Sequence, residues 1–212
     1  MKKLVLIGGG GYCSGVLDSL RGQKEYEIVG ITDPCIAAGE KSHGVTVLGT
    51  DAILPQLYDS GVHHAFVTVG SVKDCRLRMK LTAMAKKIGF HLITVVDPTA
   101  VIAETARLGE MVYVGKRAVI NADATIGNGC LINTGSIVEH GCRIGDFVHV
   151  APGAVLAGDI SVGDRSHIGL NATLLQGIQI GADAVIGAGA IVLRDVQTNE
   201  VAVGLVKKGK SI

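Results

Sequence analysis

An aliphatic residue recurs at every sixth position through the second half of the chain. All sixteen positions are Ile, Leu or Val, without an insertion: Ile102, Leu108, Val114, Ile120, Ile126, Ile132, Val138, Ile144, Val150, Leu156, Val162, Ile168, Leu174, Ile180, Ile186 and Val192. A six-residue period is typical of a parallel β-helix, in which three short strands form a triangular coil and each strand points one aliphatic side chain inward. The series predicts a column of a little over five coils.

Two further positions of the hexad support this interpretation. The residue two before the aliphatic is mostly small: Ala100, Ala106, Ala118, Ala124, Cys130, Ser136, Cys142, Ala154, Ser166, Ala172, Ala184 and Ala190. A narrow interior holds one large and one small side chain per strand, so we expect these residues, including the two cysteines, to pack in the core. Glycine often follows the aliphatic directly, which we interpret as a requirement of tight corners.

The first hundred residues have a different pattern. Apolar runs at 3–8, 27–32, 65–69 and 91–96 predict strands, and the stretches up to about Gly22 and from about Ser71 to Lys87 predict helices. Strands that alternate with helices indicate a parallel α/β sheet. Asp97 and Pro98 mark the join, so the predicted domains are a Rossmann-like domain at 1–97 and a β-helix at 98–212.

A glycine-rich turn follows the first predicted strand and opens a helix. Residues 8–15 read GGGGYCSG, and in this setting backbone N–H groups can meet a phosphate at a helix N-terminus. Asp33 ends the second predicted strand, where it either meets a ribose or base or is a solvated loop residue. One short α/β half favours a mononucleotide over a dinucleotide.

Composition excludes several classes of protein. The net charge is +1 without an extended basic cluster, so nucleic-acid binding is not expected. The apolar runs are far shorter than a membrane span, and the N-terminus lacks a signal-peptide pattern. The five cysteines, an odd number, have no CxxC spacing, which favours a reducing, cytoplasmic location.

The polar side chains of the predicted column indicate where chemistry takes place. An uninterrupted prism forms no pocket of its own, so a neighbouring subunit or the α/β domain must complete one, and three-sided columns suit a homotrimer. His140 lies near a corner and is a candidate general base, although a solvated surface histidine is the alternative. His149 lies on another side of the prism, one coil from His167. His140 and His149 can therefore share a site only across a subunit interface.

Two stretches carry a family resemblance: residues 133–140 (NTGSIVEH) and 143–150 (RIGDFVHV). Together they resemble the sugar O-/N-acetyltransferases of the PglD/NeuD type, and the resemblance extends from the glycine-rich turn to Gly204. It implies a homotrimer with intersubunit active sites, a Rossmann-like domain that holds a nucleotide-sugar, and a left-handed β-helix that binds acetyl-CoA. No metal is expected, and the implied setting is cytoplasmic biosynthesis of a cell-surface polysaccharide or glycan.

The resemblance also implies roles for individual residues. His140 matches the general base, Asn133 a residue near the sugar, and His149 a histidine at the acetyl end of acetyl-CoA. Residues that match the lining of the CoA cleft are Gly158, Leu170 and Ala188. Residues that match the nucleotide-binding loops are Gly10, Gly11, Tyr12, Asp33 and Gly70.

The chain departs from the family pattern at three places. The C-terminal G-x-P-A-K stretch of the family reads GLVKK at residues 204–208, without the proline. Tyr12 stands where the family usually has histidine, which leaves a phosphate contact there open. Gly141 stands where the family usually has an acidic residue that raises the basicity of the catalytic histidine. Glu139, or a group from another chain, is the candidate replacement.

The predicted reaction is acetyl transfer from acetyl-CoA to the amino group of a nucleotide-linked amino sugar, such as a UDP-4-amino-4,6-dideoxy sugar. O-acetylation of a sugar such as sialic acid is the nearest alternative. A zinc lyase of the γ-carbonic anhydrase type would use His149 and His167 as ligands, but the third histidine at short spacing is missing. A non-catalytic trimer that binds a nucleotide-sugar is a further alternative.

Overall fold

The computed structural model describes residues 1–207, which form two compact units. The first unit consists of Met1–Ser71 and Cys75–Val95. The second contains the chain from Val96 onward and also the short segment Val72–Asp74. This segment lies inside the predicted first domain, yet its contacts are with the second unit.

The first unit contains a six-stranded sheet in the order β3-β4-β2-β1-β5-β6, parallel except for the β3–β4 pair. Its strands are β1 (Lys2–Ile7), β2 (Tyr26–Thr32), β3 (Lys41–Ser42), β4 (Val45–Gly49), β5 (His64–Val67) and β6 (His91–Leu92). Its helices are α1 (Gly11–Leu20), the 3-10 turn η1 (Asp51–Ile53), α2 (Leu54–Asp59) and α3 (Arg76–Ile88). The second half of β1 is fully buried, as the apolar run predicts.

Three details of the first unit differ from the sequence prediction. The run at 91–96 is two strands, because β6 joins the α/β sheet whereas β7 (Val95–Val96) begins a sheet of the β-helix. Helix α3 begins at Arg76 rather than near Ser71, since Val72–Asp74 packs with the other unit. Elements β3, β4, η1 and α2 were not predicted, because each spans too few residues to show a clear hydrophobic period.

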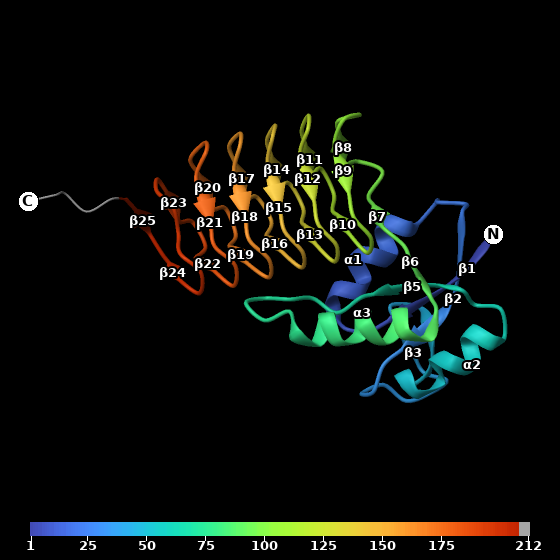
Figure 1. Ribbon diagram of the computed structural model, residues 1–212. Helices are drawn as coiled ribbons and strands as arrows, with labels where there is room; N and C mark the ends of the chain where they lie inside the picture. Colours follow the sequence, from blue (N-terminus) through green and yellow to red (C-terminus); the bar gives the residue numbers. More distant parts are fainter. Residues whose placement is uncertain (208–212) are drawn as a thin grey trace, which may run out of the picture. The chain divides into compact units, whose positions relative to one another are not determined.

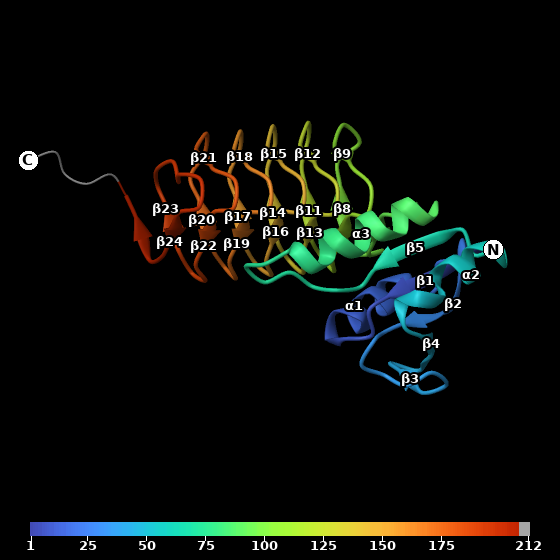
Figure 2. The same cartoon turned by 60° about the horizontal axis from the view of Figure 1, so that its bottom comes forward.

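The second unit is a parallel β-helix of two-residue strands, which stack eighteen residues apart except at the last coil, where the spacing is shorter (Figures 1 and 2). Face C contains β7, β10 (Tyr113–Val114), β13 (Leu131–Ile132), β16 (His149–Val150), β19 (His167–Ile168), β22 (Val185–Ile186) and β24 (Val201–Ala202). Face D contains β8 (Val101–Ile102), β11 (Val119–Ile120), β14 (Ile137–Val138), β17 (Val155–Leu156), β20 (Thr173–Leu174), β23 (Ile191–Val192) and β25 (Leu205–Val206). Face E contains β9 (Arg107–Leu108), β12 (Thr125–Ile126), β15 (Arg143–Ile144), β18 (Ser161–Val162) and β21 (Gln179–Ile180). The predicted fold class, an α/β domain followed by a hexapeptide-repeat β-helix, is confirmed.

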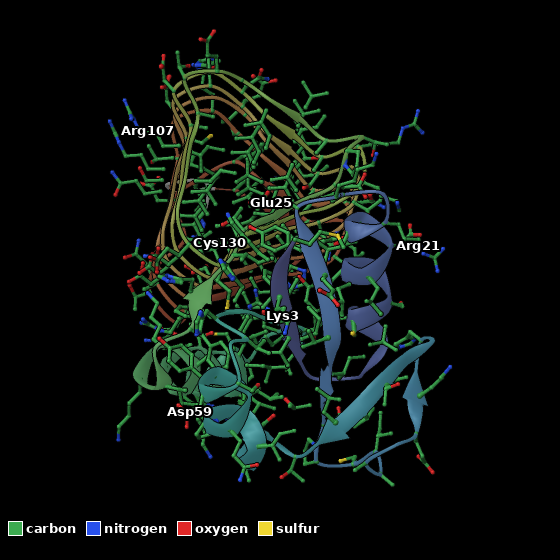
Figure 3. The ribbon with its side chains drawn as sticks, turned by 90° about the vertical axis from the view of Figure 1, so that its right-hand side faces the viewer. Lys3, Arg21, Glu25, Asp59, Arg107 and Cys130 are labelled. Carbon is green, nitrogen blue, oxygen red and sulfur yellow. The ribbon has the colours of Figure 1, made fainter. Side chains whose placement is uncertain are left out.

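The interior of the β-helix holds the residues that the hexad predicts. The aliphatic residues from Val114 to Val192 are almost completely buried, and so are the small residues from Ala118 to Ala190. The two cysteines of the column pack in this core, where the Cys130 and Cys142 thiols lie 3.0 and 3.2 Å from the carbonyl oxygens of Gly145 and Ala157. Figure 3 shows the coils of the β-helix one behind another, and the Arg107 side chain projects from their outer surface.

Glycine often follows the aliphatic residue, but the reason that we gave for it, a tight corner, is wrong. None of these glycines has a positive φ. Instead, the next coil passes too close for a side chain: a Cβ at Gly145 would lie 2.8 Å from the backbone nitrogen of Asp164, and one at Gly127 would lie 2.6 Å from the carbonyl carbon of Gly145. Close stacking of the backbone, rather than left-handed conformation, is what requires glycine here.

The left-handed residue at the corners lies three positions after the aliphatic. At every sixth residue from Met111 to Gly189 the φ angle is between 52° and 74°. Only six of these positions are glycine, so the chain places other residues, such as Phe147 and Arg165, in a conformation that costs roughly 1–2 kcal/mol. The ladder of the neighbouring coils must hold them there.

Candidate functional site

The predicted nucleotide-binding loops gather at one end of the α/β sheet. The turn after β1, Asp33 after β2 and Gly70 after β5 all follow the carboxyl ends of neighbouring parallel strands. The chain passes from β1 to β2 on one side and later to β5 on the other, so β1 is where the strand order reverses. Open α/β sheets bind ligands in the crevice at such a switch point.

The four glycines of the turn fall into two pairs. Gly8 has a φ of 107°, and a Cβ there would meet Val69, while a Cβ at Gly9 would lie 2.9 Å from the Ile36 side chain. The fold itself therefore requires these two. At Gly10 and Gly11 a Cβ would have no other atom within 4 Å, and neither residue has a positive φ. Their backbone is open, at the N-terminus of α1, as an approaching phosphate requires.

Side chains from two other loops hold this turn in place. The Asp33 carboxylate accepts hydrogen bonds from the Gly9 N–H at 2.7 Å and the Cys35 N–H at 2.8 Å, so Asp33 is more than a solvated loop residue. The Ser42 hydroxyl donates to the Gly9 carbonyl oxygen at 2.7 Å, and His43 Nε2 lies 3.2 Å from the Gly10 carbonyl oxygen. Sequence reasoning missed Ser42 and His43, because they reach the turn from the unpredicted β3 hairpin.

Behind the turn lies a buried cation. Arg78 is 1% exposed, and its Nη1 donates to the carbonyl oxygens of Val67 at 2.7 Å and Val69 at 3.0 Å. Its guanidinium also lies 5.8 Å from the centroid of the Tyr12 ring. A Cβ at Gly70 would be 3.7 Å from the Tyr12 Cβ, so the turn and the loop after β5 meet at this ring. The structure thus brings together every residue predicted for the nucleotide.

Face C of the β-helix carries a pocket of about 500 Å³. It brings together four of the residues predicted for acetyl-CoA and sugar, which are Asn133, His149, Leu170 and Ala188. Val72 and Lys73 form part of its wall, so the segment that sequence reasoning assigned to a helix covers the column here. A single chain therefore forms part of the cavity that we expected to require a neighbour or the α/β domain.

The orientation of Asn133 fixes the hydrogen bonding of His149. The Thr134 N–H donates to Asn133 Oδ1 at 2.9 Å, so the amide nitrogen is the atom that lies 3.3 Å from His149 Nε2. Because an amide NH₂ can only donate, this ring nitrogen must accept, which places the imidazole proton on Nδ1. The register of the strands pairs His149 with His167, as their spacing predicts.

His140 lies at the corner between faces D and E, together with Gly158. It is exposed at the turn after β14, and its Nε2 and Cε1 lie 2.5 Å from where a Cβ of Gly158 would stand. Gly158 therefore leaves room for the ring and is not among the residues that line the face C pocket. In a three-sided coil the corner between D and E is opposite face C. One chain therefore cannot bring its own His140 to its own pocket.

Two carboxylates lie near His140. One oxygen of Glu139 accepts the His140 backbone N–H at 3.3 Å, and no described residue forms a hydrogen bond with the His140 imidazole. A Cβ at Gly141 would overlap Oδ1 of Asp159 on the next coil. The space of the missing acidic side chain is therefore occupied by another carboxylate, which the sequence spacing of eighteen residues could have indicated.

Other surfaces of residues 1–207 hold no predicted site. A hollow of about 560 Å³ on face E, lined by Arg143, Ser161, Gln179 and their neighbours, contains none of the predicted residues. Within the described chain there is no group of three or more His, Cys, Asp or Glu side chains placed to hold a metal ion. The helices of this part of the chain include none that is long and apolar enough to cross a membrane.

Comparison with known families assigns both units. The family described as the PglD N-terminal domain matches residues 3–85. The family described as bacterial transferase hexapeptide (six repeats) matches residues 123–158, and the hexapeptide repeat of succinyl-transferase matches residues 159–194. Among curated protein sequences, none matches the chain.

Solved structures match almost the full length. A histidine-to-asparagine mutant of perosamine N-acetyltransferase from Caulobacter crescentus, in complex with CoA and GDP-perosamine, is 40% identical and covers 95% of this chain and 93% of its own, with a TM-score of 0.87. The acetyltransferase domain of PglB from Neisseria gonorrhoeae, in complex with acetyl coenzyme A, is 30% identical and covers 96% of both chains, with a TM-score of 0.88. WeeI from Acinetobacter baumannii is 25% identical over 95% of this chain and 96% of its own, with a TM-score of 0.82.

Proposed function

The chain belongs to the PglD-type family of hexapeptide-repeat sugar acetyltransferases, and on that premise we propose that it moves the acetyl group of acetyl-CoA to the amino group of a nucleotide-linked amino sugar. It is an acetyl-CoA-dependent acyltransferase with a left-handed β-helix. The observation that carries the substrate class is the 40% identical structure that holds CoA and GDP-perosamine. A GDP-linked amino sugar is accordingly the first acceptor to test, ahead of the UDP-linked sugars.

Each domain binds one of the two substrates. Residues 1–97 hold the nucleotide at the open turn of Gly10 and Gly11, and residues 98–212 bind acetyl-CoA along the face C pocket, with Val72 and Lys73 as an added wall. The apolar lining of that pocket suits the pantetheine arm and the acetyl group. The five free cysteines of the chain are in keeping with a cytoplasmic location.

Acetyl transfer needs a base at the acceptor amine. The amine nitrogen attacks the thioester carbonyl carbon and loses a proton to His140, and the tetrahedral intermediate then expels the CoA thiolate, which takes up a proton. His140 suits this role because its imidazole is exposed and no described side chain occupies its ring nitrogens. Backbone N–H groups stabilise the oxyanion in this scheme.

The catalytic site is proposed to form between subunits. Because His140 lies opposite face C, the histidine that serves one pocket belongs to another copy of the chain. A contact between two different surfaces, corner to face, must close into a ring or extend into a filament. A ring of three columns is the closed form that three-sided prisms favour.

Face D supplies an apolar surface for this assembly. The outward residue of its strands is aliphatic at Val101, Val119, Ile137, Val155, Ile191 and Leu205, with Thr173 as the exception. Val101 and Leu205 remain 61% and 57% exposed in the single chain. The equivalent positions on face E are Arg107, Thr125, Arg143, Ser161 and Gln179. A mostly apolar strip beside a polar one marks a protein–protein contact, here with further copies of this chain.

A transfer assay tests the reaction. The protein is incubated with labelled acetyl-CoA and a panel of GDP-, UDP- and dTDP-linked 4-amino sugars and sialic acid, and both thiol release and product mass are measured. We expect N-acetylation of an amino sugar. Acetylation of sialic acid alone would replace the reaction with O-acetylation, and failure to bind acetyl-CoA would favour a non-catalytic trimer.

Light scattering tests the assembly. The expected mass is about three times 21.9 kDa. Ile137→Arg on face D should break the trimer and abolish activity, whereas Thr125→Arg at the equivalent position of face E should leave both intact. A fully active monomer of Ile137→Arg would overturn the intersubunit site.

A further inference from the structure

One side chain of the face C pocket has no role in the mechanism above. His167 lies one coil beyond His149, with the two ring centroids 4.9 Å apart. It is 9% exposed and lines the same pocket. Most of the surrounding lining is aliphatic or glycine, so a second buried imidazole here needs a reason.

Neither ring nitrogen of His167 has a hydrogen-bond partner among residues 1–207. Nδ1 is enclosed by protein and unsatisfied. Nε2 also has no partner but is not enclosed, so it is the nitrogen that faces the open space of the pocket. A ligand in the pocket can therefore reach Nε2, whereas Nδ1 stays enclosed by protein.

The surroundings of His167 specify the kind of ligand group. Burial, followed by the nearby Lys73 ammonium, lowers the pKa of His167, so the ring is neutral near pH 7. A neutral imidazole in an apolar pocket suits a neutral partner such as an amide better than a phosphate. An enclosed N–H without an acceptor is rarer than an enclosed acceptor without a donor, so the proton belongs on Nε2, as a donor.

We propose that His167 Nε2 donates a hydrogen bond to the first amide carbonyl of the pantetheine arm of the acyl donor. The inference rests on the proposed function, with the thioester beside His149. Adjacent strands of a coil stack are about 4.8 Å apart, and in the arm only two methylene groups separate the thioester sulfur from the first amide. His167 is therefore one coil along from the thioester, where that amide lies. It is a positioning residue for the donor.

Truncated donors test this assignment. The donors are acetyl-CoA, S-acetylpantetheine, S-acetyl-N-acetylcysteamine, which keeps only the first amide, and S-ethyl thioacetate, which has no amide. His167→Phe retains a ring without a hydrogen bond, His167→Gln restores an amide donor, and Ser161→Ala on face E is the control variant. For each, kcat and KM are measured with every donor.

We expect His167→Phe to raise KM roughly fivefold for all three amide-containing donors, the size of one ordinary hydrogen bond. The KM for the nucleotide-sugar and kcat/KM for S-ethyl thioacetate should be unchanged, and His167→Gln should recover most of the loss. Ser161→Ala should behave as wild type.

Three results would overturn the assignment. An effect with acetyl-CoA alone would place His167 against a phosphate, an equal loss with S-ethyl thioacetate would make it a structural residue, and no effect on any donor would remove it from the site. Titration calorimetry with CoA separates these results from failure of the proposed function. If wild type does not bind CoA, the function fails, whereas if it binds and His167→Phe binds equally well, only this inference fails.

Discussion

Two corners of each coil of the β-helix differ in the residue that follows the inward aliphatic side chain. At the corner between faces E and C, the residue after the aliphatic is glycine in each of five coils: Gly109, Gly127, Gly145, Gly163 and Gly181. There the Asp146 carboxylate accepts the Asn128 N–H at 2.7 Å, and Asp164 accepts that of Asp146 at 2.8 Å. At the corner between D and E, the same position holds Ala103, Asn121, Glu139, Ala157, Leu175 and Leu193. The corner between faces E and C, here called the stacking corner, needs glycine so that successive coils can pack. The corner between faces D and E, here called the chemical corner, accepts larger side chains and can therefore hold catalytic residues.

The largest effect is expected where the stacking corner is filled. A Cβ at Gly163 would lie 2.5 Å from the backbone nitrogen of Ala182, which cannot move aside. Gly163→Leu should therefore cost about 3 kcal/mol of stability or prevent folding. Ala157→Leu is the matched control, because Leu175 already occupies that position one coil later. Thermal unfolding of the two variants measures the difference, and equal midpoints would mean that the corners are equivalent.

The chemical corner should show the opposite behaviour. His140→Ala should lower kcat roughly a hundredfold, typical of a lost general base. It should leave the unfolding midpoint and acetyl-CoA binding nearly unchanged, because the exposed imidazole makes no hydrogen bond with described residues. Steady-state kinetics and calorimetry are the measurements, with His91→Ala as a surface control. Full activity of His140→Ala at neutral pH would refute the base.

The glycine-rich turn of the first unit can be compared with the two corners of the β-helix. Gly10 resembles the chemical corner, since neither φ nor packing requires glycine there. Gly10→Val should raise the KM for the nucleotide-sugar about tenfold by obstructing the phosphate, while the KM for acetyl-CoA and the unfolding midpoint change little. An unchanged nucleotide-sugar KM would show that the turn is not the site.

The smallest effect is expected from the carboxylates beside His140. Glu139→Gln should lower kcat a few-fold in steady-state kinetics, because a nearby carboxylate favours the imidazolium that forms when the base accepts its proton. Asp159→Asn is the companion variant, because its carboxylate fills the space beside Gly141. If only Asp159→Asn lowers kcat, Glu139 is not the partner.

The sequence predicted more of the structure of the β-helix than of the first unit. In the β-helix, strand positions, inward residues and the stacking of His149 on His167 all followed from the hexad, because its register is regular and local. The reason for the regular spacing of glycine did not follow, since it depends on the backbone one coil away. In the first unit, β1 and β2 were predicted from apolar runs, but the hairpin that brings Ser42 and His43 to the turn was not. Its strands, of two and five residues, are too short to show a clear period.

The sequence by itself determined the column, its core, the α/β half and the family, because each rests on a repeat or a motif contained within a few residues. The tertiary structure alone decided which residues meet. It brought Val72 and Lys73 to face C and left His167 Nε2 facing an apolar space. Such contacts join residues that are distant along the chain, and only folding brings them together.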